Sequence, residues 1–225
     1  MGLLLFQNEA CMVINKLPGE FSELPGIDEA GGAKFFPVHR LDTPVSGCLL
    51  LAKNPEAAAF LGAAFAEPAA GKGSGECRVE KRYWAIIEMP PEDLPAEGEL
   101  VHWINYNRKA NKSFASPVKQ RADSKKAVLR YRVTGKGERY LFLEIDLVTG
   151  RHHQIRSQLA AIGLRIKGDL KYGARRSEKG GGIRLHAYSL AFPNPLDPAE
   201  TIRVSTLPPV MDPLWEDFAA TALNV

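Results

Sequence analysis

An unbroken apolar run, Gly-Cys-Leu-Leu-Leu-Ala-Lys at residues 47–53, is the strongest indication of how this chain folds. Side chains on both sides of an extended chain would be apolar here, which is typical of a strand covered on both faces of a sheet. Asn54, Pro55 and Glu56 follow and supply an N-cap, a proline at the first helical position and an acid in the first turn. The pattern predicts a buried strand that leads into a helix over 55–65.

Alternation of apolar residues predicts three more strands, over 79–87, 126–133 and 140–148. The side chains expected to share one side of the first are Lys81, Tyr83, Ala85 and Ile87, and those of the last are Leu141, Leu143, Ile145 and Leu147. The stretch 67–76 is rich in Gly and Ala and is expected to be a loop. Strands outnumber helices, so we expect an α+β fold with a mixed, largely antiparallel central sheet flanked by helices and loops. We expect residues 1–225 to form a single catalytic domain.

A second helix is expected over 151–162, with Gly163 ending it. Its buried stripe would contain Ile155, Leu159 and Ile162. Arg156 lies about 60° from Leu159 around such a helix, so its guanidinium is expected to be half-buried.

The net charge of +3 hides a strong segregation along the 225 residues. Residues 1–100 carry 8 Lys and Arg against 15 Asp and Glu, a net charge of −7, and include lysines expected to be exposed, such as Lys16 and Lys34. Residues 101–184 carry 20 against 6, a net charge of +14, and residues 185–225 carry 1 against 5, a net charge of −4. The basic segment also contains Trp103, Tyr106 and Phe114. It is either a surface for a polyanion or a solvated face that keeps the protein soluble.

Several classes of protein find no support. No apolar run approaches the roughly 20 residues of a membrane span, so a cytoplasmic protein is expected. Three cysteines without a Cys-x-x-Cys pair argue against a disulfide framework and a zinc site, and are expected to be reduced. The motifs of metalloproteases, P-loop enzymes, esterases and dinucleotide-binding proteins are absent. His152 and His153 would point about 100° apart on a helix, so we expect no metal site.

Asp42 stands out among the acids. It follows His39-Arg40 and precedes Thr43-Pro44, on a turn that leads directly into the buried strand. A carboxylate held by a rigid element suits catalysis. Local chemistry alone favours the alternative that it caps the turn through an Asx hydrogen bond, which is a common role for Asp before Thr-Pro.

Four ordered segments resemble the motifs of the RluA-type pseudouridine synthases. They are His-Arg-Leu-Asp-Thr-Pro-Val-Ser-Gly at 39–47, Lys-Arg-Tyr-Trp-Ala at 81–85, Thr-Gly-Arg-His-His-Gln-Ile-Arg at 149–156 and Leu-His-Ala-Tyr-Ser-Leu-Ala-Phe at 185–192. Gly168-Asp169-Leu170-Lys171-Tyr172-Gly173 continues the third. The matching part of the chain covers about 39–195.

The resemblance implies an enzyme that isomerises uridine in tRNA or rRNA to pseudouridine, with no cofactor and no metal. Asp42 would be the catalytic carboxylate, Tyr83 the ring stacked on the flipped uracil, Arg156 the ion-pair partner of Asp42, and Arg40 the side chain inserted where the base has left. The further residues expected to bind substrate are His39, Arg151, His153 and Gln154. Taken alone, Tyr83 could equally be a core aromatic.

Members of this family commonly carry a small RNA-binding domain of the S4 type before the catalytic domain. Only 38 residues precede His39, so we expect recognition of RNA by the catalytic domain itself. We also expect a monomer. Two alternatives differ in class. A non-catalytic RNA-binding protein would need the basic surface but not the set Arg40, Asp42, Tyr83 and Arg156. A nucleoside hydrolase is disfavoured because 20 Lys and Arg in the basic segment exceed what a small uncharged substrate needs.

Overall fold

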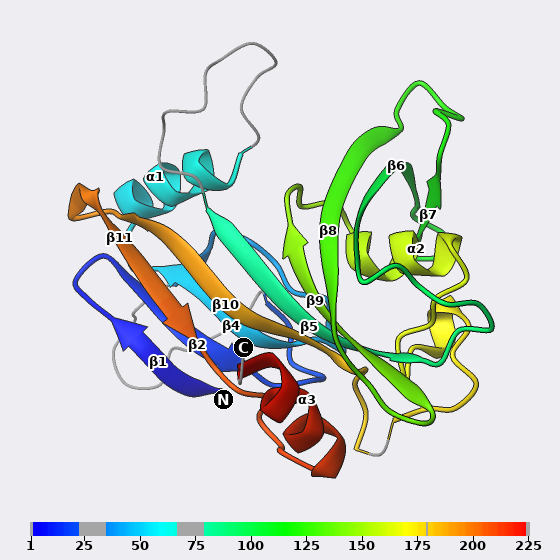
Figure 1. The fold of residues 1–225 in the computed structure, drawn as a ribbon. Coiled ribbons are helices and arrows are strands. Elements are labelled where there is room, and N and C mark those ends of the chain that lie inside the picture. The colour runs from blue at the N-terminus through cyan, green and yellow to red at the C-terminus, as the bar shows by residue number, and fades with distance from the viewer. Residues whose placement is uncertain (1, 23–34, 67–78, 179, 224–225) are drawn as a thin grey trace. The chain divides into compact units, whose positions relative to one another are not determined.

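The computed structural model describes residues 2–22, 35–66, 79–178 and 180–223 (Figure 1). The chain divides into two compact units, one of residues 1–81 and 187–209 and the other of residues 82–186 and 210–225. We refer to them as the first and the second unit. The assignment of 1–225 to one catalytic domain stays a prediction. None of the helices in the described ranges has the length and apolar run that crossing a membrane requires.

The first unit is built on a sheet with the strand order β1-β2-β4-β10, in which β3 also pairs with β4 and β11 with β10. Its elements are β1 (Leu3–Gln7), β2 (Cys11–Lys16), β3 (Phe36–Pro37), β4 (Ser46–Ala52), α1 (Pro55–Phe65), most of β10 (Leu185–Asn194) and β11 (Asp197–Ser205). All seven residues of β4 are buried, which confirms the covered strand predicted at 47–53. The predicted helix is confirmed at both ends, with the side chain of Asn54 accepting from the backbone N–H of Ala57.

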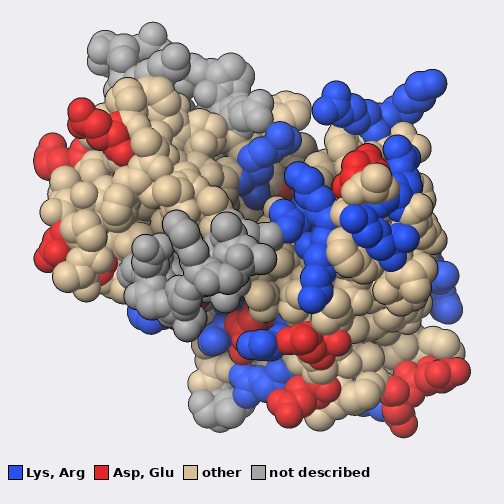
Figure 2. Space-filling model, turned by 90° about the horizontal axis from the view of Figure 1, so that it is seen from above, with Lys and Arg blue, Asp and Glu red and all other residues tan. Residues whose placement is uncertain are grey.

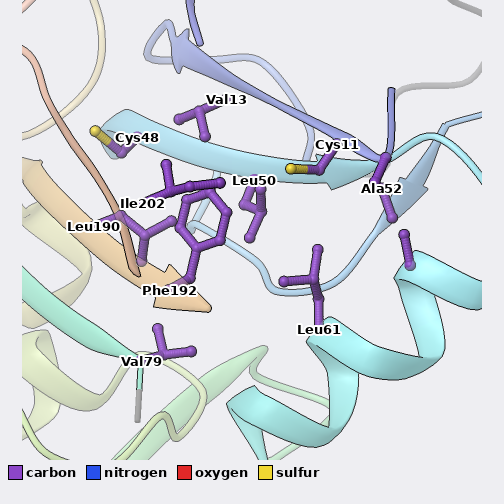
Figure 3. Close-up of a cluster of buried hydrophobic side chains, with 12 residues drawn as sticks. Cys11, Val13, Cys48, Leu50, Ala52, Leu61, Val79, Leu190, Phe192 and Ile202 are labelled. Atoms are coloured by element: carbon purple, nitrogen blue, oxygen red, sulfur yellow. The ribbon is translucent and has the colours of Figure 1, made fainter. Parts of the chain in front are cut away.

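The core of the first unit lies where α1 packs on its strands. Figure 3 shows Leu61 of α1 directed toward the side chains of β2, β4 and β10. The fully buried members of this cluster include Cys11, Leu50 and Phe192. Burial raises the pKa of Cys11 to about 11 and that of Cys48 to about 12, because a thiolate would lose its hydration. These two cysteines are free, as predicted, and both are buried, while Cys77 lies outside the described residues.

The second unit is built on a sheet with the strand order β5-β9-β8-β6-β7. Its elements are most of β5 (Glu80–Glu88), β6 (Glu97–Asn107), β7 (Lys112–Ser116), β8 (Lys125–Lys136), β9 (Tyr140–Leu147), α2 (Gln154–Ala161), the 3-10 turn η1 (Leu170–Tyr172) and α3 (Pro213–Leu223). Each neighbouring pair in this sheet is antiparallel. The antiparallel strand pairs, with three helices among the described residues, confirm the α+β class.

The register of the second unit decides which side chains share a face with α2, because side chains alternate along a strand. One cross-strand row contains Tyr83 of β5, Ile145 of β9 and Tyr131 of β8. Ala127 shares that face, four residues before Tyr131, and pairs with His102 of β6. Nδ1 of His102 lies 3.2 Å from Nε2 of Gln158 in α2. The face of the sheet that carries Tyr83 is therefore the face covered by α2.

The opposite face of the same sheet is covered by α3. The ring of Trp84 stacks on Phe218 with a centroid distance of 4.7 Å, and Phe142 lies 5.2 Å from the same ring. Trp84 and Ile86 are fully buried, as are Ala85 and Ile87 on the α2 face. Strand β5 is thus covered on both sides. Its sequence pattern predicted which residues share a side, but not that both sides are buried.

The predicted helix over 151–162 is wrong at its start and, for Ile162, in its buried stripe, whereas Ile155 and Leu159 are buried as predicted. Helix α2 begins at Gln154, because His153 before it has the left-handed backbone conformation, with φ of 50°. Ile162 follows the last helical residue and is 39% exposed. Gly163 ends the helix as predicted, with φ of 80° and the backbone N–H of Leu164 bonded to the carbonyl of Leu159 at 3.0 Å. The loop predicted at 67–76 lies outside the described residues.

Gly47 and Gly62 form a matched pair that tests the packing of β4. A Cβ on Gly47 would lie 2.3 Å from the carbonyl oxygen of Ala187, at a φ of 118°. A Cβ on Gly62, inside α1, would meet nothing within 4 Å outside its own helix backbone. We expect Gly47→Ala to lower the free energy of unfolding by about 3 kcal/mol or more, from overlap and backbone strain. Gly62→Ala should raise it by about 0.5–1 kcal/mol, from helix propensity.

Urea unfolding of both variants measures these changes. Equal stability of the two variants would contradict the close approach of β4 and β10.

Candidate functional site

The turn that carries Asp42 is held by a serine from a distant part of the first unit. Asp42 is half-buried, and its carbonyl accepts from the backbone N–H of Val45 at 2.9 Å, which closes the turn before β4. The hydroxyl of Ser22 donates to the carbonyl of Leu41 at 2.8 Å and accepts from its N–H at 2.9 Å. The backbone on both sides of Asp42 is therefore fixed, which suits a carboxylate that must keep one position.

Lys16 lies beneath the same turn and is fully buried, so its predicted exposure is wrong. Its ammonium donates to three carbonyls, those of Leu17 and Glu20 at 2.9 Å and that of Thr43 at 3.2 Å. Burial lowers the pKa of Lys16 from 10.5 to about 8, and the charges of Glu20 and Asp42 oppose this decrease. Lys34 lies outside the described residues.

His39 makes structural contacts within the first unit. Its Nε2 accepts from the backbone N–H of Leu50 at 2.9 Å, and its ring stacks on Phe65 at 4.7 Å. Burial, and next the charge of Lys81, lower the pKa of His39 to about 3, so the ring is neutral near pH 7. Its contact with substrate stays a prediction. Arg40, next to it, is exposed, and its insertion into RNA stays a prediction.

Tyr83 and Arg156 are brought to one face of the sheet in the second unit. Tyr83 is 7% exposed and lies on β5, on the face covered by α2. Arg156 belongs to α2 and is 4% exposed. The expected half-burial of Arg156 is therefore wrong, because its partner removes it from water almost completely. Stacking of Tyr83 on a uracil stays a prediction.

That partner is Asp169, which is 2% exposed. Nε and Nη2 of Arg156 donate to the two carboxylate oxygens of Asp169 at 2.7 and 2.8 Å, in a bidentate ion pair. The guanidinium also lies over the ring of Tyr172, 4.9 Å from its centroid. The predicted ion pair between Arg156 and Asp42 is not tested by these contacts and stays a prediction.

His153 and Gln154 are buried and bonded to protein groups. Nδ1 of His153 lies 3.0 Å from the hydroxyl of Tyr172. Burial, and next the charge of Arg156, lower the pKa of His153 to about 3, so it is neutral near pH 7. Oε1 of Gln154 accepts from the hydroxyl of Thr149 at 2.8 Å and from the N–H of Arg151 at 2.9 Å. These bonds order the segment before α2, and substrate contacts of these residues stay predictions.

The two adjacent histidines do not diverge as a helix would require, because both precede α2. Their rings stack with a centroid distance of 3.8 Å, and His152 also lies 4.1 Å from the ring of Tyr106. Nδ1 of His152 bonds to the hydroxyl of Ser113 at 3.0 Å. Within the described residues, no group of three or more His, Cys, Asp or Glu has the arrangement of a metal site.

The basic charges of the second unit fall into two classes. Arg130, Arg132 and Lys136 each form an ion pair, with Glu99, Glu144 and Asp93 respectively. Lys109, Lys125 and Lys126 are exposed and form no ion pair with any residue of the described ranges. Figure 2 shows Lys and Arg side chains gathered on one face of this unit. The segregated charge of the sequence is therefore only partly neutralised by local acids.

Exposed aromatic side chains lie on the β6–β7 hairpin of the same unit. Tyr106 is 43% and Phe114 50% exposed. Lys112 lies 5.6 Å from the centroid of Phe114, and Lys119 lies 5.2 Å from that of Trp103. Aromatic rings beside cations are the elements with which proteins stack bases and hold phosphates of single-stranded nucleic acids.

Three functional candidates were missed from sequence: Lys16, Asp169 and Tyr172. Asp169 and Tyr172 lie in the segment 168–173, which continues the third motif, and this was the one indication available for them. Lys16 is the last residue of β2, and the other five residues of that strand are all apolar or uncharged. This pattern could have indicated that Lys16 is buried. Its three carbonyl partners come from two separate turns, which no local pattern indicates.

Comparison with known proteins relates this geometry to a family. The family model described as RNA pseudouridylate synthase matches residues 11–161. An uncharacterized RNA pseudouridine synthase of Zymomonas mobilis is 35% identical over 154 residues, 68% of this chain and 64% of that protein. This chain thus spans slightly less than two thirds of that relative. The tRNA pseudouridine synthase C of Haemophilus ducreyi is 29% identical over 95% of this chain and 92% of that protein.

Solved structures agree at the level of the fold. The human RNA pseudouridylate synthase domain containing 1 has a TM-score of 0.69 at 21% identity, and the match covers 98% of this chain and 87% of that one. The human RNA pseudouridylate synthase domain containing 4 has a TM-score of 0.68 at 20% identity, over 97% and 92%.

The buried ammonium of Lys16 predicts a pH dependence of stability. Between about pH 8 and 10.5, the unfolded chain keeps the Lys16 proton while the folded chain has released it. Raising the pH in this range therefore favours the folded state, by up to about 1.4 kcal/mol per pH unit. We expect the free energy of unfolding of wild type minus that of Lys16→Met to be flat below pH 7.5 and to rise by about 1 kcal/mol from pH 8 to 9.

Taking the difference between the two proteins cancels the contributions of Cys11 and Cys48, which titrate at higher pH in both. Urea titrations at half-unit steps of pH measure it. A difference that stays constant from pH 7 to 9.5 would show that Lys16 keeps its ordinary pKa.

Proposed function

Since the chain belongs to the RNA pseudouridylate synthase family, we propose that it isomerises particular uridines of tRNA or rRNA to pseudouridine. The match of the family model over residues 11–161 carries this proposal. The name of the Haemophilus ducreyi relative, a tRNA pseudouridine synthase, supports tRNA as one substrate class. The exposed lysines without ion pairs in the second unit support a polyanionic substrate.

The proposed reaction is balanced within the uridine itself. The bond between N1 and C1′ breaks, the uracil turns, and a bond forms between C5 and C1′. The proton that leaves C5 is matched by the proton that N1 carries in the product. No oxidant, reductant or cofactor takes part, so the protein has to supply a group that acts on the ribose or the base and a platform for the detached ring.

Asp42 is the proposed group. Its turn is fixed by Ser22 and by the bond from Lys16 to the carbonyl of Thr43, and these contacts support a carboxylate held in one place. A positioned carboxylate can act as a nucleophile or as a base, and both routes use the same aspartate. Arg156 is the proposed partner that aims it, since a guanidinium offers donors in a fixed plane.

Base flipping completes the proposal. A uridine inside a folded RNA has to be unstacked, at a cost of a few kcal/mol, before a side chain can reach its ribose. Stacking on the ring of Tyr83 would recover part of that cost, because base–aromatic stacking contributes about 1–3 kcal/mol. Arg40, which is exposed and two residues before Asp42, is the proposed side chain that fills the space left by the base.

Pseudouridine mapping tests the proposed function directly. We expect one or more sites in tRNA or rRNA to lose pseudouridine in cells without this protein, and to regain it when the protein is restored. The purified protein should form pseudouridine at the same sites in unmodified transcripts. If binding occurs without any isomerisation, the alternative of a non-catalytic RNA-binding protein would be favoured.

Asp42→Asn isolates the carboxylate. The substitution keeps the size and polarity of the side chain, so the fold and RNA affinity should stay within about twofold of wild type, while pseudouridine formation falls at least about a thousandfold. Single-turnover assays and filter binding measure the two quantities. Wild-type turnover by Asp42→Asn would refute the proposed mechanism, and loss of RNA affinity alone would assign Asp42 to binding.

The proposed RNA-binding face predicts a particular salt dependence. Each phosphate contact contributes about −0.7 to the slope of log K against log salt on single-stranded RNA. Replacing Lys109, Lys125 and Lys126 together by Gln should therefore flatten the slope by about 2. The rate at saturating RNA should change little, because none of the three belongs to the catalytic set.

The matched control replaces the ion-paired Arg130, Arg132 and Lys136 by Gln. It removes the same number of positive charges from the same unit, but these charges already face acids, so the slope should change by less than about 0.7. Equal changes in both triple variants would mean that net charge alone attracts RNA and that this face has no special role.

A further inference from the structure

The guanidinium of Arg156 is fixed by a set of side chains within the second unit. Asp169 holds two of its nitrogens at 2.7 and 2.8 Å, and the ring of Tyr172 lies 4.9 Å from it. Asp169 and Tyr172 are 2% and 7% exposed, so water does not compete for these contacts. A bidentate pair fixes the plane of a guanidinium, and an aromatic ring beneath it restricts motion out of that plane.

Tyr172 is itself anchored to strand β7. Its hydroxyl accepts from the backbone N–H of Ser113 at 2.9 Å and donates to the carbonyl of Ser113 at 3.0 Å. Nδ1 of His153 lies 3.0 Å from the same oxygen. The hydroxyl therefore joins η1, β7 and the residue before α2 at one point.

A second cation contacts the same ring from β7. The ammonium of Lys112 lies 4.9 Å from the centroid of Tyr172, and the guanidinium of Arg156 lies at the same distance. Lys112 also lies 5.6 Å from Phe114, which is exposed on the hairpin surface. A continuous series of contacts thus leads from the exposed side of the β6–β7 hairpin to Arg156.

We propose that Asp169 and Tyr172 are positioning residues for Arg156, and that Tyr172 joins the guanidinium to the hairpin that carries the exposed aromatic rings and lysines. This inference rests on the proposed function, because Arg156 is the side chain proposed to aim Asp42. Asp169 fixes the plane of the guanidinium. Tyr172 restricts motion of the guanidinium of Arg156 out of its plane, and it transmits any movement of β7 to that guanidinium.

Tyr172→Phe is the primary test, because it keeps the ring beneath Arg156 and removes only the hydroxyl. Asp169→Asn removes the charge opposite a buried guanidinium and can prevent folding, so it serves as a second variant. Tyr140→Phe is the matched control. It removes a hydroxyl from a half-buried tyrosine of the same unit whose ring also lies near a cation, Lys167, at 5.9 Å.

We expect Tyr172→Phe to lower the single-turnover rate at saturating RNA about tenfold or more, with RNA affinity within about twofold of wild type, because small displacements of a catalytic group are costly. Tyr140→Phe should match wild type in both. In the Arg156→Lys background, Tyr172→Phe should lower the rate by less than about twofold, because the guanidinium that Tyr172 positions is already absent.

If Tyr172 has only a structural role, Tyr172→Phe lowers thermal stability and leaves the rate of the folded protein unchanged. Alternatively, its effect on the rate is the same in the Arg156→Lys background as in wild type, so that the two effects multiply. Either result would overturn the inference.

A readout that needs no turnover separates this inference from the proposed function. The Nε–H resonance of Arg156, assigned by its loss in Arg156→Lys, should exchange slowly with solvent in wild type and about tenfold faster or more in Tyr172→Phe, with Tyr140→Phe unchanged. Unchanged exchange in Tyr172→Phe would overturn the positioning role even in an active enzyme. If wild type forms no pseudouridine, the proposed function fails, and the exchange rates still decide whether Tyr172 holds Arg156.

Discussion

A guanidinium withdrawn from water has to be matched by a carboxylate, and in the second unit this requirement joins α2 to η1. Arg156 and Asp169 are almost fully buried, and each would be costly to bury without the other. Because Tyr172 lies beside this pair and bonds to both backbone groups of Ser113, the position of β7 is tied to it as well. Three elements distant in sequence are thus ordered around one charge.

The first unit buries a cation in a different way. Lys16 has three carbonyl oxygens around its ammonium, and burial moves its pKa down to about 8. Carbonyls orient a cation without cancelling its charge, so the turn that carries Asp42 is ordered by a group whose charge is sensitive to pH. In the second unit the buried cation is a guanidinium, which keeps its proton near neutral pH, and it is held by a carboxylate rather than by carbonyls. The two units therefore order their proposed catalytic residues by different means.

Local patterns in the sequence were sufficient for β4 and α1, because the apolar run and the cap of Asn54 need no distant partner. They were insufficient where a distant residue decides the outcome. The burial of Arg156 depends on Asp169, 13 residues later, and the start of α2 depends on the left-handed conformation of His153. The family and its motif residues were available from the resemblance of four ordered segments to the family's motifs, whereas the residues that hold them, Lys16 and Tyr172, became evident only from tertiary contacts.

The alternation of side chains along β5 has a consequence for how the length of this chain can change. Tyr83 faces α2 and Trp84 faces α3, so inserting or deleting one residue within β5 would move the side chains beyond the change to the opposite face. The hairpin tip between β6 and β7 has no alternation of buried faces to preserve, so it could gain or lose single residues. We therefore expect the length of that tip to vary freely among related chains. In the strand that carries Tyr83, we expect either no change in length or insertions and deletions of an even number of residues.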